Sequence, residues 1–157
     1  MKIYRFRYRR RILTGILKEE FLFPIKGSVF GEFTLENSLV PISEVKLLPP
    51  VVPTKIIGIG TNYRDHADEM GKKIPEEPLL FLKPSSALAG PFDVIRNPGM
   101  STRVDYEGEL AVVIGKKACR LKDDEDVSKY ILGYTCFNDV TARDLQQKDV
   151  QFSRAKS

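Results

Sequence analysis

The most informative segment of the sequence is Val104-Asp-Tyr-Glu-Gly-Glu-Leu-Ala-Val-Val-Ile114. Its apolar second half is typical of a strand, and we expect one long strand from Val104 to Gly115. Glu107 and Glu109 lie two residues apart at the mouth of this strand, so both side chains leave the same face. Neighbouring carboxylates are costly to bury unless protons or a cation compensate them. A hard divalent metal would do so, and a solvated strand end is the alternative.

A second informative segment is Phe137-Asn-Asp-Val-Thr-Ala-Arg-Asp-Leu-Gln146. It predicts a helix over 140–149 with Asp139 at its N-terminus. Arg143 and Gln146 follow Asp139 by four and seven positions, which places all three on one helical face. The ordinary interpretation is a helix cap with an i,i+4 ion pair. The functional one is a third carboxylate around Mg²⁺ or Mn²⁺, with open positions for a chelating substrate.

Two apolar runs, at 55–60 and 79–83, are typical of buried strands. Between them, residues 64–70 favour a short helix, with Asn62 as its cap and Gly71 as its C-terminal stop. A Gly-x-Gly occurs at 58–60, but the third glycine of a dinucleotide fingerprint is absent, so this interpretation is discarded.

Three further residue types are candidates for chemistry. His66 and Glu69 lie three positions apart and share a face of the short helix, where the carboxylate could orient the imidazole as a general base. A single histidine is more often structural. Lys83 and Lys156 could each place an ammonium beside an anionic substrate, and either could equally be an ordinary surface lysine.

Residues 2–9 alternate between aromatic and arginine side chains. This period predicts a half-buried strand whose aromatic residues at 4, 6 and 8 face the core and whose arginines at 5, 7 and 9 face water. Arginines beside stacking aromatics could bind RNA, but a solvated face that protects a sheet edge is the more usual arrangement.

The proline-rich segment Leu48-Pro-Pro-Val-Val-Pro53 marks a boundary, because it favours extended geometry and cannot continue a helix or a central strand. Before it, residues 21–45 contain short apolar runs broken by Gly and Pro, as in small antiparallel strands. We therefore expect a small β domain over residues 1–48 and the main domain over residues 49–157, in a β-rich α+β fold.

Composition excludes several classes of protein. The 157 residues are 42% hydrophobic and 29% charged, which suits a globular domain rather than a disordered, collagenous or disulfide-stapled chain. No apolar run is long enough for a transmembrane helix, and residues 1–11 lack the apolar region expected of a secretory signal. Two cysteines fit a reducing cytoplasm. The net charge of +4 is concentrated in residues 1–20, which hold seven Lys or Arg and two Glu, so any nucleic-acid partner would bind there, and we do not expect one.

Five ordered segments resemble the motifs of the fumarylacetoacetate hydrolase family, in particular members of the acylpyruvate hydrolase and 2-hydroxyhepta-2,4-diene-1,7-dioate isomerase kind. The resemblance covers residues 47–157. Residues 1–46 resemble the variable N-terminal extension of many microbial members. The segments are Gly60-Thr-Asn-Tyr-Arg-Asp-His-Ala-Asp-Glu-Met70, Pro78-Leu-Leu-Phe-Leu-Lys-Pro-Ser85, Asp105-Tyr-Glu-Gly-Glu-Leu-Ala-Val-Val-Ile-Gly-Lys116, Gly133-Tyr-Thr-Cys-Phe-Asn-Asp-Val-Thr-Ala-Arg-Asp-Leu-Gln146 and Arg154-Ala-Lys-Ser157.

The resemblance implies a mixed β-sandwich roll and a role for each matching residue. It implies a Mg²⁺ or Mn²⁺ site at Glu107, Glu109 and Asp139. It implies catalytic roles for His66, Glu69 and Lys156, with Lys156 on or beside a mobile lid. It implies substrate contacts at Lys83, Arg143 and Gln146. It further implies a homodimer that acts on a small 2-oxo acid in aromatic catabolism.

The reaction expected first is hydrolysis of a C–C bond in an acylpyruvate or fumarylacetoacetate-like acid, through a metal-stabilised enolate. Isomerisation of a 2-hydroxydienedioate and decarboxylation of oxaloacetate would use the same residues, so the motifs do not separate them. The alternative from another class is an RNA-binding module that uses the arginine-rich strand.

The family's core continues beyond the position that matches Ser157, and its further strands would pair with those present. We therefore expect the chain by itself to be a C-terminally truncated form that exposes sheet edges and apolar surface, and to be unstable or to aggregate.

Overall fold

The computed structural model describes all of residues 1–157, and the chain is rich in strands with two short α-helices. The expected β-rich α+β class is confirmed. Two compact units are present: residues 1–51, 90–93 and 108–138 form one, and residues 52–89, 94–107 and 139–157 form the other. Every strand pair is antiparallel. No helix has the length and apolar character needed to cross a membrane.

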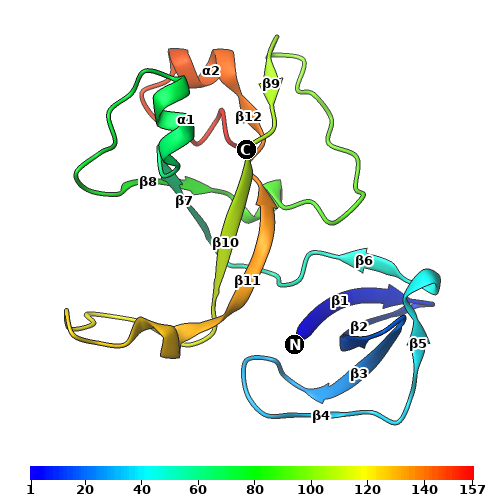
Figure 1. The fold of residues 1–157 in the computed structure, drawn as a ribbon. Helices are drawn as coiled ribbons and strands as arrows, with labels where there is room; N and C mark the ends of the chain where they lie inside the picture. The colour runs from blue at the N-terminus through cyan, green and yellow to red at the C-terminus, as the bar shows by residue number, and fades with distance from the viewer. The chain divides into compact units, whose positions relative to one another are not determined.

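The N-terminal sheet has the strand order β4-β3-β2-β1-β6, with β5 also paired to β3 (Figure 1). Two-residue turns join β1 to β2 and β2 to β3, as the register shows. The small antiparallel strands expected within residues 21–45 are confirmed. The strands are β1 Lys2–Tyr8, β2 Arg11–Lys18, β3 Phe21–Gly27, β4 Phe33–Leu35, β5 Val40–Pro41 and β6 Lys46–Leu48.

Alternation in β1 places the aromatic residues in the core, as predicted. Phe6 is fully buried with Leu22 and Val40, and Tyr4 and Tyr8 pack partly buried against them. The opposite positions of a strand face away from such a core because side chains alternate. The last arginine of the predicted series lies outside the strand: residue 9 is in the turn between β1 and β2 and has a φ of 53°.

Strands β7 (Ile56–Gly60) and β8 (Leu79–Lys83) form a ribbon. Gly58 pairs with Phe81 so closely that a Cβ at residue 58 would lie 2.2 Å from the phenyl ring. The sequence predicted two buried strands, and this is wrong for both. No residue of β7 is fully buried, and Ile57 is exposed. In β8, Phe81 and Lys83 are buried, whereas the alternate positions, such as Leu80, are exposed. Only one face of the ribbon, the face of Phe81 and Lys83, is therefore packed against the rest of the protein.

Helix α1 (Arg64–Glu69) ends as predicted at Gly71. Gly71 has a φ of 60°, its N–H donates to the carbonyl of Asp68, and the next N–H, at residue 72, donates to the carbonyl of Ala67. This pair of bonds is a Schellman motif, which satisfies the last carbonyls of a helix. The predicted cap is wrong: Tyr63, rather than Asn62, is the N-cap, and it makes no side-chain capping bond.

The long strand expected over 104–115 is two strands. β9 (Val104–Asp105) pairs with β12 (Thr141–Ala142), whereas β10 (Gly108–Ile114) pairs with β11 (Ile131–Asn138) in the long ribbon of Figure 1. The chain therefore changes partner strand at residues 106–107, which is where the first of the two glutamates lies.

The helix expected over 140–149 begins later, as α2 (Arg143–Lys148). Thr141 and Ala142 are used by the pairing with β9, and the N-cap is Ala142, so Asp139 does not cap the helix. The exposed face of β10 carries three apolar residues, Leu110, Val112 and Ile114. Exposed apolar surface of this kind favours aggregation, and the aggregation of the isolated chain stays a prediction.

Candidate active site

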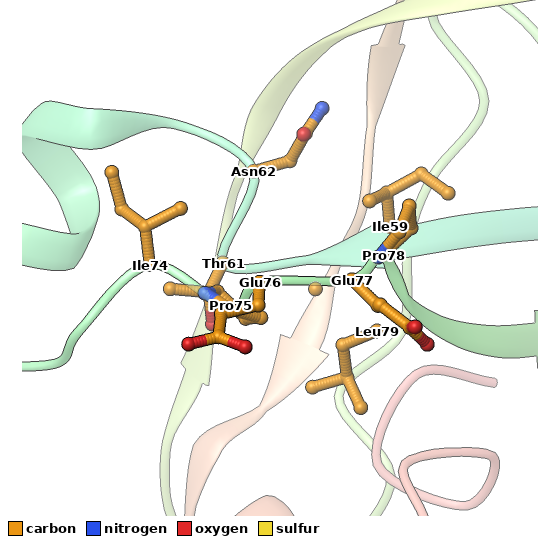
Figure 2. A pocket seen from close by; sticks show the side chains of 10 residues that line it. Ile59, Thr61, Asn62, Ile74, Pro75, Glu76, Glu77, Pro78 and Leu79 are labelled. Carbon is orange, nitrogen blue, oxygen red and sulfur yellow. The ribbon is translucent and has the colours of Figure 1, made fainter.

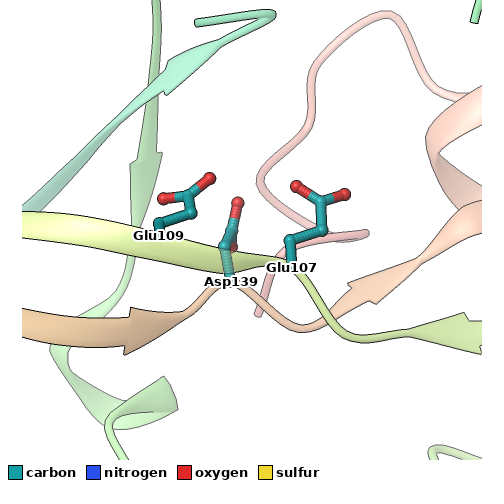
Figure 3. Close-up of side chains that lie close together, drawn as sticks. All are labelled: Glu107, Glu109 and Asp139. Carbon is teal, nitrogen blue, oxygen red and sulfur yellow. The ribbon is translucent and has the colours of Figure 1, made fainter. Parts of the chain in front are cut away.

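Backbone pairing brings Glu107 and Asp139 together. The N–H of Asp139 donates to the carbonyl of Glu107 at 2.9 Å, next to the Gly108–Asn138 pair at the end of the β10–β11 ribbon. Carboxylate oxygens of Glu107, Glu109 and Asp139 all lie within 4.8 Å of one another. Figure 3 shows the three side chains rising from the same side of these strands. The structure therefore gathers the three residues that the sequence analysis proposed as metal ligands.

Asp139 is the most buried of the three, with 1% of its surface exposed. Lys83 Nζ lies 2.5 Å from Asp139 Oδ1, and Lys156 Nζ lies 2.7 Å from Oδ2. The second contact is an ion pair by distance only, because Oδ2 accepts no hydrogen bond of good geometry. Lys83 also donates to the backbone carbonyl of Lys156. Both lysines are buried and paired with an acid, so neither is an ordinary surface lysine.

Glu107 is held by groups on three segments. Its Oε1 accepts from Arg143 at 2.6 Å and from the Thr141 hydroxyl at 3.1 Å, and its Oε2 accepts from Lys156 at 2.9 Å. Burial by itself raises the pKa of Glu107, but the hydrogen bonds and charges of Lys156 and Arg143 outweigh it and hold this pKa below its usual value. The carboxylate is therefore kept ionised, as a metal ligand must be.

Arg143 is buried, and each of its three guanidinium nitrogens donates to a different side chain. Nε donates to Asp105 at 3.0 Å, one terminal nitrogen to Gln146 at 2.7 Å, and the other to Glu107. Burial by itself lowers the pKa of Arg143, but the hydrogen bonds that it donates to Asp105 and Glu107 outweigh burial and raise this pKa above its usual value. The guanidinium is thus a fixed positive charge beside the acidic cluster.

The prediction that Asp139, Arg143 and Gln146 share one helical face is wrong, although the three residues do belong to the same network. Asp139 precedes β12 and lies outside α2, so it cannot share a helical face with Arg143. Gln146 reaches Arg143 as an i,i+3 neighbour on α2. Asp139 joins the network through the lysines and through its backbone bond to residue 107.

His66 and Glu69 form a separate pair on α1. The distance between His66 Nδ1 and Glu69 Oε2 is 3.8 Å, and the two side chains are 40% and 79% exposed. This separation exceeds a hydrogen bond. The two residues of the proposed dyad therefore lie near each other but are not hydrogen-bonded.

Two residues of the network, and one beside it, were missed from the sequence. Thr141 is fully buried and donates to Glu107, and nothing in its sequence context marks it. Asp144 accepts hydrogen bonds from residues 101 and 102. Asp105 binds Arg143. Asp105 had a signal: it lies two residues before Glu107, so it continues the alternation of acids that singled out the glutamates.

The residues present fit a hard divalent cation. Three carboxylates converge, one of them buried with an oxygen that receives no hydrogen bond. Carboxylate oxygens are the ligands that Mg²⁺ and Mn²⁺ prefer. Three protein ligands would also leave coordination positions open, as in catalytic sites.

A separate cavity of about 150 Å³ lies between the end of β7 and residues 74–79 (Figure 2). Its wall includes Thr61, which has a φ of 54°, an uncommon conformation for a β-branched residue. None of the residues of the acidic network lines it. We do not assign it to the site.

Two protein-family models match the chain. The model described as fumarylacetoacetate (FAA) hydrolase C-terminal matches residues 55–157, and the model described as Rv2993c-like, N-terminal matches residues 1–50.

Curated relatives are similar over most of the chain. An uncharacterized protein of Archaeoglobus fulgidus is 54% identical over 143 residues, which cover 86% of this chain and 57% of the relative. The oxaloacetate tautomerase YisK of Bacillus subtilis is 47% identical over 128 residues, covering 78% of this chain and 42% of YisK. The chain spans about half the length of the curated relatives it matches.

Solved structures share the fold. A 5-carboxymethyl-2-hydroxymuconate delta-isomerase from Mycobacterium smegmatis superposes with a TM-score of 0.85 at 34% identity, covering 100% of this chain and 62% of that one. A maleylpyruvate hydrolase from Sphingobium, solved with manganese(II) and pyruvate, superposes with a TM-score of 0.68 at 26% identity, covering 91% and 60%.

Proposed function

Because the chain belongs to the fumarylacetoacetate hydrolase family, we propose that it is part of a metal-dependent enzyme that interconverts the keto and enol forms of a 2-oxo acid such as oxaloacetate. The observation that carries the proposal is the convergence of Glu107, Glu109 and Asp139 beside the buried guanidinium of Arg143. The similarity to an oxaloacetate tautomerase at 47% identity supports the choice of reaction.

Glu107, Glu109 and Asp139 would hold the cation, which we propose to be Mg²⁺ or Mn²⁺. When bound, it would supply a Lewis acid that stabilises negative charge on the substrate oxygens. The manganese(II) ion of the similar maleylpyruvate hydrolase supports this assignment.

Arg143 and Gln146 would bind the substrate carboxylate. A guanidinium and an amide side by side offer several N–H donors, and charge-assisted bonds to a carboxylate are stronger and shorter than neutral ones. Lys83 and Lys156 add two buried positive charges close to Asp139, which favour a dianionic substrate. These four residues therefore bind and orient rather than transfer protons.

His66, oriented by Glu69, would move the proton in keto–enol exchange. An imidazole accepts and donates protons near neutral pH, which suits a reaction that does both. The pair lies on a short helix and is 3.8 Å apart. We propose that the hydrogen bond between them forms when substrate is bound, because such bonds tighten in the complex.

Hydrolysis of a C–C bond in an acylpyruvate is the second candidate. It would need the same carboxylates and a water activated by His66. The similarity to a maleylpyruvate hydrolase solved with pyruvate favours it. Decarboxylation of oxaloacetate and isomerisation of a 2-hydroxydienedioate in aromatic catabolism use the same residues and stay as alternatives. We further propose a homodimer, and a reducing cytoplasm in which the exposed thiols Cys119 and Cys136 stay free.

Loss of the enol absorbance of oxaloacetate, followed with Mn²⁺ present, tests the reaction. We expect catalysed ketonisation by the full-length enzyme of which this chain is part, and a fall of at least about 100-fold in Glu109→Gln. Glu76→Gln, on an exposed loop outside the network, is the matched control and should stay active. Acetylpyruvate cleavage and CO₂ release in the same samples distinguish the alternatives. Equal rates for wild type and Glu109→Gln would contradict the proposal.

A further inference from the structure

Two segments of the second unit are joined along their length. Residues 104–105 pair with residues 141–142, and the N–H of Arg143 donates to the carbonyl of Arg103 at 2.8 Å. Asp144 extends the connection, because its carboxylate accepts from the Ser101 hydroxyl at 2.6 Å and from the N–H of residue 102 at 3.1 Å. The start of α2 is therefore fixed relative to residues 101–105 by backbone and side-chain bonds together.

Asp105 lies at the end of this connection, between two guanidinium groups. Its Oδ2 lies 3.0 Å from Arg143 Nε and 3.1 Å from a terminal nitrogen of Arg103, and its Oδ1 accepts from Arg103 Nε at 3.2 Å. Asp105 therefore lies against the Nε side of the Arg143 guanidinium, and Arg103 holds it there from the other side.

The other acidic partner of Arg143 is Glu107, at 2.6 Å. Glu107 is one of the three residues that would hold the metal, and it binds a terminal nitrogen of Arg143, whereas Asp105 binds Nε. Without Asp105, only the two terminal nitrogens would be held, and a tilted guanidinium presents different N–H groups to a ligand.

We propose that Asp105 is a positioning residue, which holds the Arg143 guanidinium by Nε in the orientation that receives the substrate carboxylate. This inference rests on the proposed function. It assigns to Asp105 a role in substrate affinity rather than in the chemical step, because Asp105 acts through Arg143.

Oxalate, a dicarboxylate with no carbon to enolise, is the probe, and its dissociation constant is measured by calorimetry on the Mn²⁺-loaded, full-length enzyme of which the chain is part. Asp105→Asn removes the charge while keeping the size of the side chain. We expect oxalate binding about tenfold weaker, an equal rise of KM for oxaloacetate with kcat within about twofold, and an unchanged Mn²⁺ dissociation constant.

Asp144→Asn is the matched control. It removes one carboxylate charge from the same joined segments, but Asp144 does not contact the guanidinium, and the pairing of β9 with β12 remains. We expect it to lower the melting temperature and to leave the oxalate dissociation constant unchanged. An equal loss of oxalate affinity in Asp105→Asn and Asp144→Asn would mean a structural role for both and would overturn the proposal.

A double-mutant cycle with Arg143→Lys completes the test. If Asp105 acts through Arg143, Asp105→Asn should cost little further oxalate affinity once Arg143 is lysine. Additive losses, or a loss with Arg143→Lys and none with Asp105→Asn, would overturn the positioning role while the proposed function stands. Absence of oxalate and Mn²⁺ binding by the wild type would overturn the proposed function itself, and this inference with it.

Discussion

The N-terminal sheet and the acidic network have opposite kinds of interior. In the sheet, Phe6, Leu22 and Val40 are buried among apolar neighbours. In the network, the buried side chains include Lys83, Asp139 and Arg143. Apolar burial stabilises by removing surface from water, whereas buried charges are tolerated only while each has its partner. The first region is thus built for stability, and the second holds charges in place at a cost in stability.

The largest effect is expected from removing the central charge of the network. Asp139→Asn leaves the buried Lys83 ammonium without a carboxylate and Lys156 with Glu107 alone. Breaking a buried ion pair in this way typically costs about 3–5 kcal/mol. Thermal and urea unfolding followed by circular dichroism measure it. Asp93→Asn, which breaks the exposed ion pair with Lys46, is the control and should change stability little. A similar loss of unfolding free energy in Asp139→Asn and Asp93→Asn would show that the buried ion pairs contribute no more than the exposed one.

A somewhat smaller effect is expected in the sheet. Phe6→Ala deletes a fully buried ring and should cost about 3 kcal/mol, as cavities in apolar cores do. Because no charge is involved, this loss should be the same in low and high salt. Urea unfolding at two salt concentrations checks it. A loss that changes strongly with salt would contradict the apolar description of this core.

Lowering the pH should destabilise the connection between residues 101–105 and residues 141–144, which is part of the second region. Hydrogen bonds from Ser101, then from residue 102, hold the pKa of Asp144 well below its ordinary value of 3.8. A carboxyl with a depressed pKa in the folded state contributes stability above the unfolded-state pKa and loses it as the pH falls through the folded-state pKa. The melting temperature of wild type should therefore exceed that of Asp144→Asn at pH 6, and the difference should shrink below pH 3.8. A difference that grows toward low pH would contradict this account.

The smallest effect is expected at a turn of the sheet. Glu19 begins the two-residue turn between β2 and β3 with a φ of 53°, where a side chain is strained and glycine is not. Glu19→Gly should stabilise by about 0.5–1 kcal/mol. Glu20→Gly, at the adjacent residue whose φ is not positive, should destabilise slightly. The opposite order of the two melting temperatures would contradict the assignment of strain.

Sequence reasoning succeeded where one local pattern determines the outcome. The alternation of residues 2–9 predicted the aromatic core of β1, and Gly71 predicted the end of α1. It failed where partners far apart in the sequence decide. The break between β9 and β10 exists because residues 104–105 pair with residues 141–142, and this pairing also delays the start of α2.

The candidate site shows the same division. The two glutamates and Asp139 could be proposed from their spacing and from the family resemblance, and the structure gathers them. The burial of Lys83 and Lys156 could not be predicted, because a lysine after an apolar run is equally consistent with the surface. Asp105 was overlooked because its partner Arg143 lies in a different segment.

Titration of the full-length enzyme with Mn²⁺, followed by the loss of the free-ion paramagnetic resonance signal, is the sharpest test of the proposed metal site. We expect saturable binding of one ion per subunit, weakened at least about tenfold in Glu109→Gln and unchanged in Glu76→Gln. An absence of saturable binding, or equal affinity in wild type and Glu109→Gln, would show that the converging carboxylates are no metal site.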